Sequence, residues 1–475
     1  MPLPKQLIYR ERGRTREPSS SQPIKLSECG ARSPVALQAI DRQYLLVAKL
    51  FLLALGSRGD VQPFVALASG LQGAGHDVVL ATPEGFTKLM AGRNFTHVEV
   101  MSSPESLLGA PDDELVRTVK RHPVRELRRL LSGWFAQIDD VLAAIPDAAN
   151  GADLVMWWEP LGNFGRHLAE SLGVPGVAGG LNPENWASST IPEPNFPWPP
   201  SWVPAAWSSR YVLFGHAVFL QITTSLYRSR VNRWRQDVLG LPSLARLASV
   251  ADKVAQPKLR LTEVSPLVRD LPPEWQGSVV PTGYWLLPPD EGWTMPEELR
   301  AWLEDGPPPM FASMGSAVGF PAPLGPMVVE AARRAEVRLV LGSGWHRKGG
   351  LDTTKLPPHA IVVGEVPHES LFPLMAGIVH HGGGGSTATA LRAGVPAVAL
   401  PVFADQPYWG RRIAALGVGP DPLPAKKVTV EQLASAMRQM RDDKPMRNRA
   451  AELGTRLREE DGVGVAIREI EALLR

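Results

Sequence analysis

The chain has 475 residues, of which 44% are hydrophobic and 21% charged, a composition that predicts a packed protein of two or three domains. The formal net charge is only +2, and residues 1–47 hold eight Lys/Arg against four Asp/Glu, so nucleic-acid binding has no electrostatic footprint. A single cysteine, Cys29, excludes an intramolecular disulfide and a cysteine-based zinc site.

Residues 1–46 differ in composition from the rest of the chain. Arginines alternate from Arg10 to Arg16 and a Pro-Ser run follows at Pro18, but no apolar stretch of the signal-peptide type is present. We interpret this segment as a disordered N-terminal extension, with a transit peptide as the alternative. Elsewhere no apolar run reaches the ~18 residues needed to span a bilayer, so we expect a cytoplasmic protein without stable membrane insertion.

A regular pattern begins at Leu45. The apolar run Leu45–Leu55 is followed by the turn Gly56–Gly59, a helix predicted over Val61–Ala74 and a buried strand over Val78–Ala81. Strand, glycine turn, helix and strand form a βαβ unit, which predicts a parallel sheet. The same reading predicts strands Leu154–Trp158 and Val174–Ala178, and helices Asn163–Leu172 and Ser209–Leu239.

Residues 181–207 interrupt this pattern with seven prolines and four tryptophans. So long an irregular stretch is usually functional or disordered, and its aromatic content favours function. We expect Asn182–Trp207 to present aromatic surface, including Trp186 and Trp198, to an apolar ligand. The alternative is a surface loop pinned by its own aromatic side chains.

A second strand–helix series is predicted to begin near Pro281. The two halves therefore predict two doubly wound α/β domains, residues 47–285 and 286–475, joined near Gly283–Pro289. The strands predicted for the second half are Met310–Met314, Arg338–Leu341, Ala360–Val363, Ile378–His380 and Ala397–Leu400, and Val430–Arg475 is predicted to be helical.

The strongest local signal is the segment His380–Thr387, which reads His-His-Gly-Gly-Gly-Gly-Ser-Thr between a strand and a helix. Four glycines let backbone N–H groups approach a ligand without interference from Cβ atoms. The helix N-terminus favours an anion such as a diphosphate, and His381 can donate a ring N–H to it. An ordinary capped turn and a Gly-x-Gly-x-x-Gly dinucleotide fingerprint are the alternatives, and the contiguous glycines fit the second poorly.

Two acidic positions also follow predicted strands. Asp405 and Gln406 come after Ala397–Leu400 and offer acceptors and a donor suited to sugar hydroxyls. Asp60 opens the helix after Gly56–Gly59, where it would serve either as an N-cap carboxylate or as a general base. The residues alone leave both possibilities open for Asp60.

The segment from Gly56 to Phe64 and the segment from His380 to Gly410 closely resemble the sterol glucosyltransferases. They are also similar to the bacterial glycosyltransferases that decorate glycopeptides, polyketides and glycolipids. The resemblance covers about residues 47–475. It implies the GT-B fold, two Rossmann-like domains facing across a cleft, with a C-terminal helix near Val463–Leu474 crossing back to the first domain.

The resemblance also implies roles for individual residues. Asp60 matches the catalytic base, Ser316 a diphosphate-binding hydroxyl, and Val366 the backbone of a loop that cradles the nucleobase. The positions that match the diphosphate loop are His381, Gly383, Gly384, Gly385 and Ser386, and those that match the donor-sugar contacts are Asp405 and Gln406. Gly384 and Ser386 stand where the family usually has Ala and Thr, and the first turn lacks the histidine of plant-type relatives.

The resemblance thus predicts an inverting enzyme that moves a hexose from a UDP- or TDP-sugar to a hydroxyl of an apolar small molecule. Trp186 and Trp198 would then contact the acceptor. No Asp-x-Asp pair occurs in the chain, so we expect no metal, and no cofactor beyond the nucleotide-sugar co-substrate. A non-catalytic auxiliary protein and a nucleotide-sugar epimerase of the same fold are the alternatives.

Overall fold

The computed structural model describes residues 47–102, 137–159, 163–181, 186–193, 199, 202–244, 257–288, 292–315, 324–342, 351–364, 366–402 and 405–475. These residues belong to one unit that runs from Leu46 to Arg475. The predicted N-terminal extension, residues 1–46, lies outside them.

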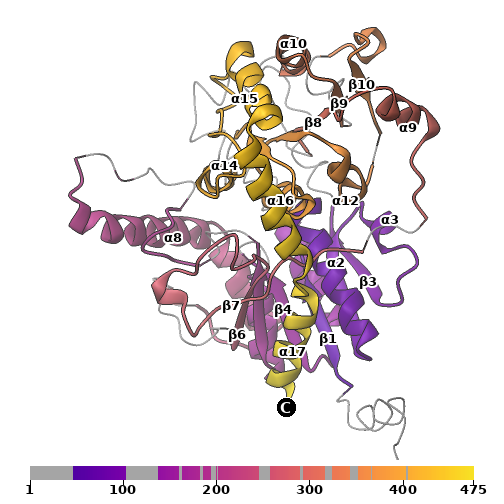
Figure 1. Cartoon of the computed structure of the whole chain (residues 1–475). Helices are drawn as coiled ribbons and strands as arrows, with labels where there is room; N and C mark the ends of the chain where they lie inside the picture. Colours follow the sequence, from indigo (N-terminus) through magenta and orange to yellow (C-terminus); the bar gives the residue numbers. More distant parts are fainter. Residues whose placement is uncertain are drawn as a thin grey trace, which may run out of the picture. The chain divides into compact units, whose positions relative to one another are not determined.

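Seven parallel strands form the first sheet, in the order β3-β2-β1-β4-β5-β6-β7 (Figure 1). The chain winds outward from β1 in both directions, as doubly wound folds do. The strands are β1 Lys49–Leu53, β2 Asp77–Pro83, β3 Thr96–Met101, β4 Leu154–Trp158, β5 Gly176–Gly180, β6 Leu259–Thr262 and β7 Val280–Pro281. The helices between them include α2 Arg58–Gly73, α3 Thr87–Met90, α7 Gly165–Leu172 and α8 Ala205–Asp237, and residues 137–148 are also helical.

A second parallel sheet has five strands in the order β10-β9-β8-β11-β12. These strands are β8 Met310–Ser313, β9 Leu339–Leu341, β10 Ala360–Val362, β11 Gly377–His380 and β12 Ala397–Ala399. Its helices include α9 Glu297–Glu304, α10 Leu324–Ala335, α12 His368–Leu371, α13 Gly384–Ala393 and α14 Gln406–Ala415. Three further helices end the chain, α15 Val430–Asp442, α16 Lys444–Arg458 and α17 Gly462–Leu474.

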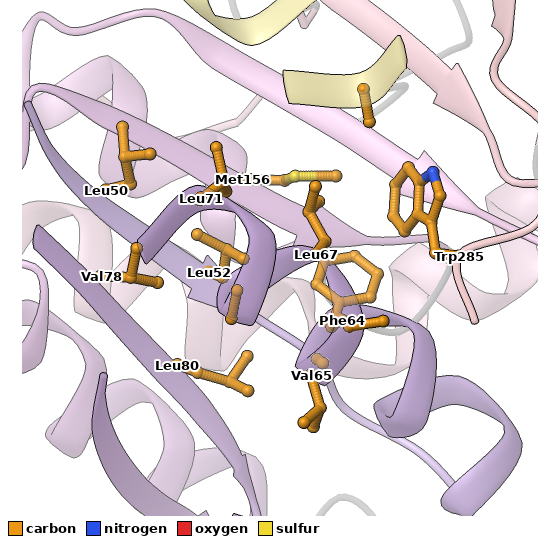
Figure 2. Packing of buried hydrophobic residues seen from close by; sticks show 14 of the residues in the cluster. Leu50, Leu52, Phe64, Val65, Leu67, Leu71, Val78, Leu80, Met156 and Trp285 are labelled. Atoms are coloured by element: carbon orange, nitrogen blue, oxygen red, sulfur yellow. The ribbon is translucent and has the colours of Figure 1, made fainter. Parts of the chain in front are cut away.

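The first core forms between β1, β2 and α2 (Figure 2). Leu50 and Leu52 alternate onto one face of β1, and Phe64, Leu67 and Leu71 recur on one side of α2. This spacing of three, four and seven residues places the helical side chains in one stripe, which covers the sheet. All five side chains have no exposed surface.

Helix α17 belongs to this first core although it ends the chain. Ala466 and Ile470 of α17 are fully buried in the cluster that contains Leu50 and Phe64. A Cβ atom on Gly70 of α2 would lie 2.5 Å from Cγ1 of Val463, so the two helices need a glycine to come this close. Helix α17 thus completes the hydrophobic core of a sheet whose first strand begins at Lys49.

The structure confirms two doubly wound parallel sheets and corrects one detail of the sequence prediction. Pro281 does not begin the second series but lies in β7, which pairs with β6 at the edge of the first sheet. The strands β3, β6 and β7 were not predicted. β7 has only two residues, and β6 carries Arg260 between two leucines, so neither shows the continuous apolar run that marks a buried strand.

Candidate active site

The carboxyl ends of parallel strands carry the predicted motifs. Gly56 follows β1, Gly315 follows β8, and His381 follows β11. In open α/β sheets this edge is where ligands bind. Helices α2 and α13, which begin after β1 and β11, contact each other, and a Cβ atom on Gly385 would lie 3.9 Å from the Cα atom of Gly59.

Asp60 lies in the first turn of α2, where its carboxylate folds back over the turn. The backbone N–H and the hydroxyl of Ser57 both donate to its Oδ2 at 2.8 Å. Gly56 makes this possible, because a Cβ atom there would lie 2.6 Å from the same oxygen and its φ is +145°. Burial raises the pKa of Asp60 to about 6, although the two bonds from Ser57 act to lower it. A half-buried carboxylate with a pKa near neutrality is suited to accept a proton.

His381 is held between two glycines. A Cβ atom on Gly383 would lie 2.4 Å from its Nε2, and one on Gly315 would lie 2.8 Å from its Cε1. Burial lowers the pKa of His381 to about 4, so the imidazole is neutral at physiological pH. Its buried Nδ1 has no hydrogen-bond partner among the described residues. The neutral imidazole of His381 is therefore held in place, and its Nδ1 atom is left for a ligand.

His380 has a different place from its neighbour. It is 1% exposed at the end of β11, and its Nδ1 accepts a hydrogen bond from the Gly382 N–H at 3.0 Å. Gly382 has φ +91°, and a Cβ atom there would lie 2.8 Å from the carbonyl oxygen of Gln406. His380 thus stabilises the glycine loop through its hydrogen bond with Gly382.

The N-terminus of α13 is built from the glycine loop. Gly383 is the N-cap, and the first turn holds Gly384, Gly385 and Ser386. Backbone N–H groups of a first turn have no partner within the helix, so they are donors suited to an anion. A Cβ atom on Gly384 would lie 2.6 Å from Cδ2 of Leu181, so a side chain here would require that leucine to shift.

Asp405 and Gln406 begin α14, and each has a defined partner. The indole N–H of Trp409 donates to Oδ2 of Asp405 at 2.8 Å, and the Val402 N–H donates to Oε1 of Gln406 at 2.8 Å. Burial, with a smaller contribution from the negative charge of Asp60, raises the pKa of Asp405 to about 7. The structure thus brings Asp60 and Asp405 within electrostatic reach of each other.

The remaining predicted residues divide into two groups. Ser316 and Trp198 lie outside the described residues. Val366 is half-buried against the core of the second sheet. Trp186, within the Asn182–Trp207 stretch, packs edge-on against Trp275 with ring centroids 5.5 Å apart, in a small cluster that includes Ile191 and Val279.

Sequence reasoning missed a third carboxyl group near Asp60. Glu263 directly follows β6, is 1% exposed, and its Oε1 has no hydrogen-bond partner among the described residues. Burial and the charge of Asp60 raise the pKa of Glu263 well above its ordinary value. The only sequence signal was its place after a strand, and that strand was not predicted.

Two negative findings concern the described part of the chain. No three His, Cys, Asp or Glu side chains converge there in a way that could hold a metal ion. None of the helices described combines the length and the apolar character needed to cross a membrane.

Comparison with known proteins matches both halves of the chain. Residues 50–188 match the glycosyltransferase family 28 N-terminal domain, and residues 335–462 match the erythromycin biosynthesis protein CIII-like C-terminal domain. The O-mycaminosyltylonolide 6-deoxyallosyltransferase of Streptomyces fradiae is 33% identical over 438 residues, which cover 87% of this chain and 95% of that protein. The sterol 3-beta-glucosyltransferase of Emericella nidulans is 34% identical over 89% of this chain. The matched part is only 30% of the length of that fungal protein.

Solved structures show the same architecture. The glycosyltransferase of kitacinnamycin aligns with a TM-score of 0.67 at 20% identity, covering 90% of this chain and 100% of that one. The calicheamicin glycosyltransferase CalG4 aligns with a TM-score of 0.60, covering 90% and 98% of the two chains. Two doubly wound sheets with a glycine loop at the start of α13 thus define a GT-B glycosyltransferase, which confirms the predicted fold. With the match to the Streptomyces fradiae enzyme, this chain belongs to the glycosyltransferase family that includes sterol and macrolide glycosyltransferases.

Proposed function

We propose that this protein is an inverting glycosyltransferase that moves a hexose from a UDP- or TDP-sugar to a hydroxyl group of an apolar small molecule. The observation that carries the proposal is the contact between the starts of α2 and α13. It brings a carboxylate with a raised pKa, Asp60, beside a helix N-terminus suited to a diphosphate.

In this reaction Asp60 takes the proton of the acceptor hydroxyl while the acceptor oxygen attacks the anomeric carbon. The bond from that carbon to the diphosphate oxygen breaks, and the diphosphate leaves on the opposite side with its electron pair. His381 and the N–H groups of Gly384–Ser386 would stabilise the negative charge that develops on the leaving group. Because these donors are fixed before the reaction, no metal ion is needed for this role.

Asp405 and Gln406 would hold the hydroxyl groups of the donor sugar. The carboxyl group of Asp405, which also interacts with Trp409 and with the backbone of Gly384, is the acceptor we assign to the sugar. Ser316 and the backbone of Val366 would complete the diphosphate and nucleobase contacts. Trp186 and Trp198 would contact the acceptor, whose apolar character is supported by the names of the sterol and macrolide relatives.

The decisive experiment incubates the protein with UDP-glucose or TDP-glucose and a panel of sterol and macrolide acceptors, with and without a chelator. We expect glycoside formation that a chelator leaves intact, and an Asp60→Asn variant that binds the nucleotide sugar but transfers about 10²–10⁴-fold more slowly. Because the amide has the size of the carboxylate, we expect Asp60→Asn to fold as the wild type does.

Other outcomes distinguish the two alternatives. Donor binding without any transfer in the wild type would favour a non-catalytic auxiliary protein. Conversion of the donor sugar to its epimer without an acceptor would favour an epimerase. Transfer by Asp60→Asn at the wild-type rate would leave Asp60 as a helix-capping residue only.

A further inference from the structure

Glu263 directly follows β6, at the carboxyl edge of the first sheet. Its backbone N–H donates to the carbonyl oxygen of Gly180 at 3.3 Å, so the residue continues the pairing between β6 and β5. Because side chains alternate between the faces of a sheet, Glu263 is on the same face as Leu261, which belongs to the first core together with Phe64 of α2. The side chain of Glu263 therefore lies on the side of the sheet that α2 covers.

The first turn of α2 brings Asp60 toward this side chain. Asp60 precedes Phe64 by four residues, so the two side chains lie on one side of the helix. Phe64 packs on the sheet against Trp285, with ring centroids 5.7 Å apart (Figure 2). Burial, and to a smaller degree the charge of Asp60, raises the pKa of Glu263 well above its ordinary value. Glu263 is thus a neutral carboxylic acid within electrostatic reach of the proposed base.

Leu181 lies between Glu263 and the glycine loop. It directly follows β5, and because Gly180 pairs with Thr262, Leu181 stands next to Glu263 in the register of the sheet. A Cβ atom on Gly384 would lie 2.6 Å from Cδ2 of Leu181. Glu263 is therefore one neighbouring side chain away from the start of α13.

One oxygen of the Glu263 carboxyl group is buried without a partner. The side chain is 1% exposed, and its Oε1 has no hydrogen-bond partner among the described residues. Glu159, which directly follows β4 and is also buried, differs because the indole N–H of Trp157 donates to it at 2.8 Å. Buried polar groups are normally hydrogen-bonded, so the exception at Glu263 calls for a functional explanation.

We infer that Glu263 binds a hydroxyl group of the donor sugar and thereby selects hexoses that carry this hydroxyl group over the corresponding deoxy sugars. A neutral carboxyl group offers one hydrogen-bond donor and an acceptor, the two roles that a sugar hydroxyl group also has. A site built to bond a hydroxyl group rejects the analogue that lacks it, because its own buried polar group is then left unpaired.

The position of Glu263 favours the donor sugar over the acceptor as the source of this hydroxyl group. The inference rests on the proposed function in one respect, the binding of a sugar diphosphate at the start of α13. A hexose attached to that diphosphate would bring several hydroxyl groups close to Leu181 and Glu263. An apolar acceptor has few hydroxyl groups, and Asp60 would take the proton of the reacting one.

The test is calorimetric titration of the full-length protein with UDP, with UDP-glucose and with UDP-glucose analogues that each lack one sugar hydroxyl group, or with the TDP series if the wild type prefers it. Glu263→Met places an apolar side chain of similar length at this position, whereas Glu263→Gln keeps a donor and an acceptor. We expect Glu263→Met to bind UDP-glucose about tenfold more weakly, the effect of one lost hydrogen bond, and to bind UDP as the wild type does. Glu263→Gln should bind both ligands as the wild type does.

The deoxy analogues identify the hydroxyl group that is bound. The wild type should bind one of them about tenfold more weakly than UDP-glucose, and Glu263→Met should lose nothing further with that analogue. Glu84→Met is the matched control, because Glu84 directly follows β2 as Glu263 follows β6 but has an exposed side chain. It should bind every ligand as the wild type does, and thermal unfolding of each variant checks that the fold is intact.

The inference is overturned if Glu263→Met binds UDP-glucose as the wild type does, if it weakens UDP and UDP-glucose equally, or if it loses the same factor on every analogue. A raised KM for the acceptor with unchanged affinity for UDP-glucose would also overturn it and place Glu263 in the acceptor site. Binding is read without turnover, so a protein that shows the expected pattern but transfers no sugar would contradict the proposed function and leave the role of Glu263 standing.

Discussion

At the scale of single residues, glycines beside the loop leave the space that the imidazole ring of His381 occupies. His381 lies between Gly315 and Gly383, neither of which could carry a Cβ atom without displacing it. Its imidazole is also neutral, because burial lowers its pKa to about 4. We therefore expect His381 to act through a positioned N–H group rather than through a positive charge.

Changing Gly383 to Ala tests this arrangement without removing the histidine. The new Cβ atom would lie 2.4 Å from Nε2 of His381, so the ring must move. We expect turnover with a nucleotide sugar to fall about 10²–10³-fold, as when a charge-stabilising donor is lost. Gly73→Ala, where no atom lies within 4 Å of the added methyl group, is the control. Equal turnover in the two variants would contradict the placement of His381.

Ser57 controls the proton affinity of Asp60. Its hydroxyl donates to the ionised carboxylate, so its loss should raise the pKa of Asp60 above the present value of about 6. For Ser57→Ala we expect the acid limb of the pH profile of kcat/KM to shift to higher pH, because Asp60 must be ionised to accept a proton. Ser69→Ala, on the same helix but bonded to the Val65 carbonyl, should leave the limb in place. An unshifted limb in Ser57→Ala would mean that another group sets it.

At the scale of elements, the chain connects the first sheet with the second after β7 and returns between α16 and α17, and these two connections contact each other. Ser265 donates to Glu460 at 2.6 Å, and a Cβ atom on Gly462 would lie 2.5 Å from the carbonyl oxygen of Tyr284. Glu460 and Gly462 lie where α16 gives way to α17, and Tyr284 follows β7. These contacts fix the point from which α17 runs along α2.

Ile470→Ala measures how much α17 contributes to the first core. Ile470 has no exposed surface and packs in the cluster around Leu50 and Phe64. We expect the free energy of unfolding to fall by ~2–5 kcal/mol, the usual range when a buried isoleucine is replaced by alanine. Arg468→Ala, an exposed change on the same helix, should have little effect in the same denaturant titration. A similar small loss for Ile470→Ala would show that α17 is only loosely attached.

At the scale of the whole molecule, the sequence predicted the strands and turns that depend on neighbouring residues. The strands Leu154–Trp158 and Ile378–His380 were readable because both are continuous apolar runs, and the second ends at the glycine loop. The effect of the Asp60 charge on the pKa of Asp405 was not readable, because it depends on α2 meeting the second half of the chain across more than 300 residues. Glu263 escaped notice for the same reason, since only the sheet order brings the end of β6 toward α2.

Glu263 should also make the stability of the whole protein depend on pH. In the unfolded chain it ionises near its ordinary pKa of 4.5, whereas burial keeps it protonated in the folded protein to a much higher pH. The folded state then binds more protons than the unfolded state, so this group's contribution to stability is lost as pH rises above 4.5. Glu263→Gln should be stabilised relative to the wild type as pH rises, with no advantage below that value.

Thermal unfolding across this pH range checks the prediction. The exposed change Glu298→Gln on α9 should follow the wild type at every pH. A Glu263→Gln variant that tracked the wild type as closely as Glu298→Gln does would show that Glu263 ionises in the folded protein.

The burial of Ala466 and Ile470 beneath the first sheet has a consequence for the order in which the protein is made. A ribosome delivers β1 and α2 before α17, which follows the strands of both sheets. Until α17 has been made, the side of α2 that receives it lacks this apolar partner. The first core is therefore complete only once α17 has been made, long after its first strand and helix.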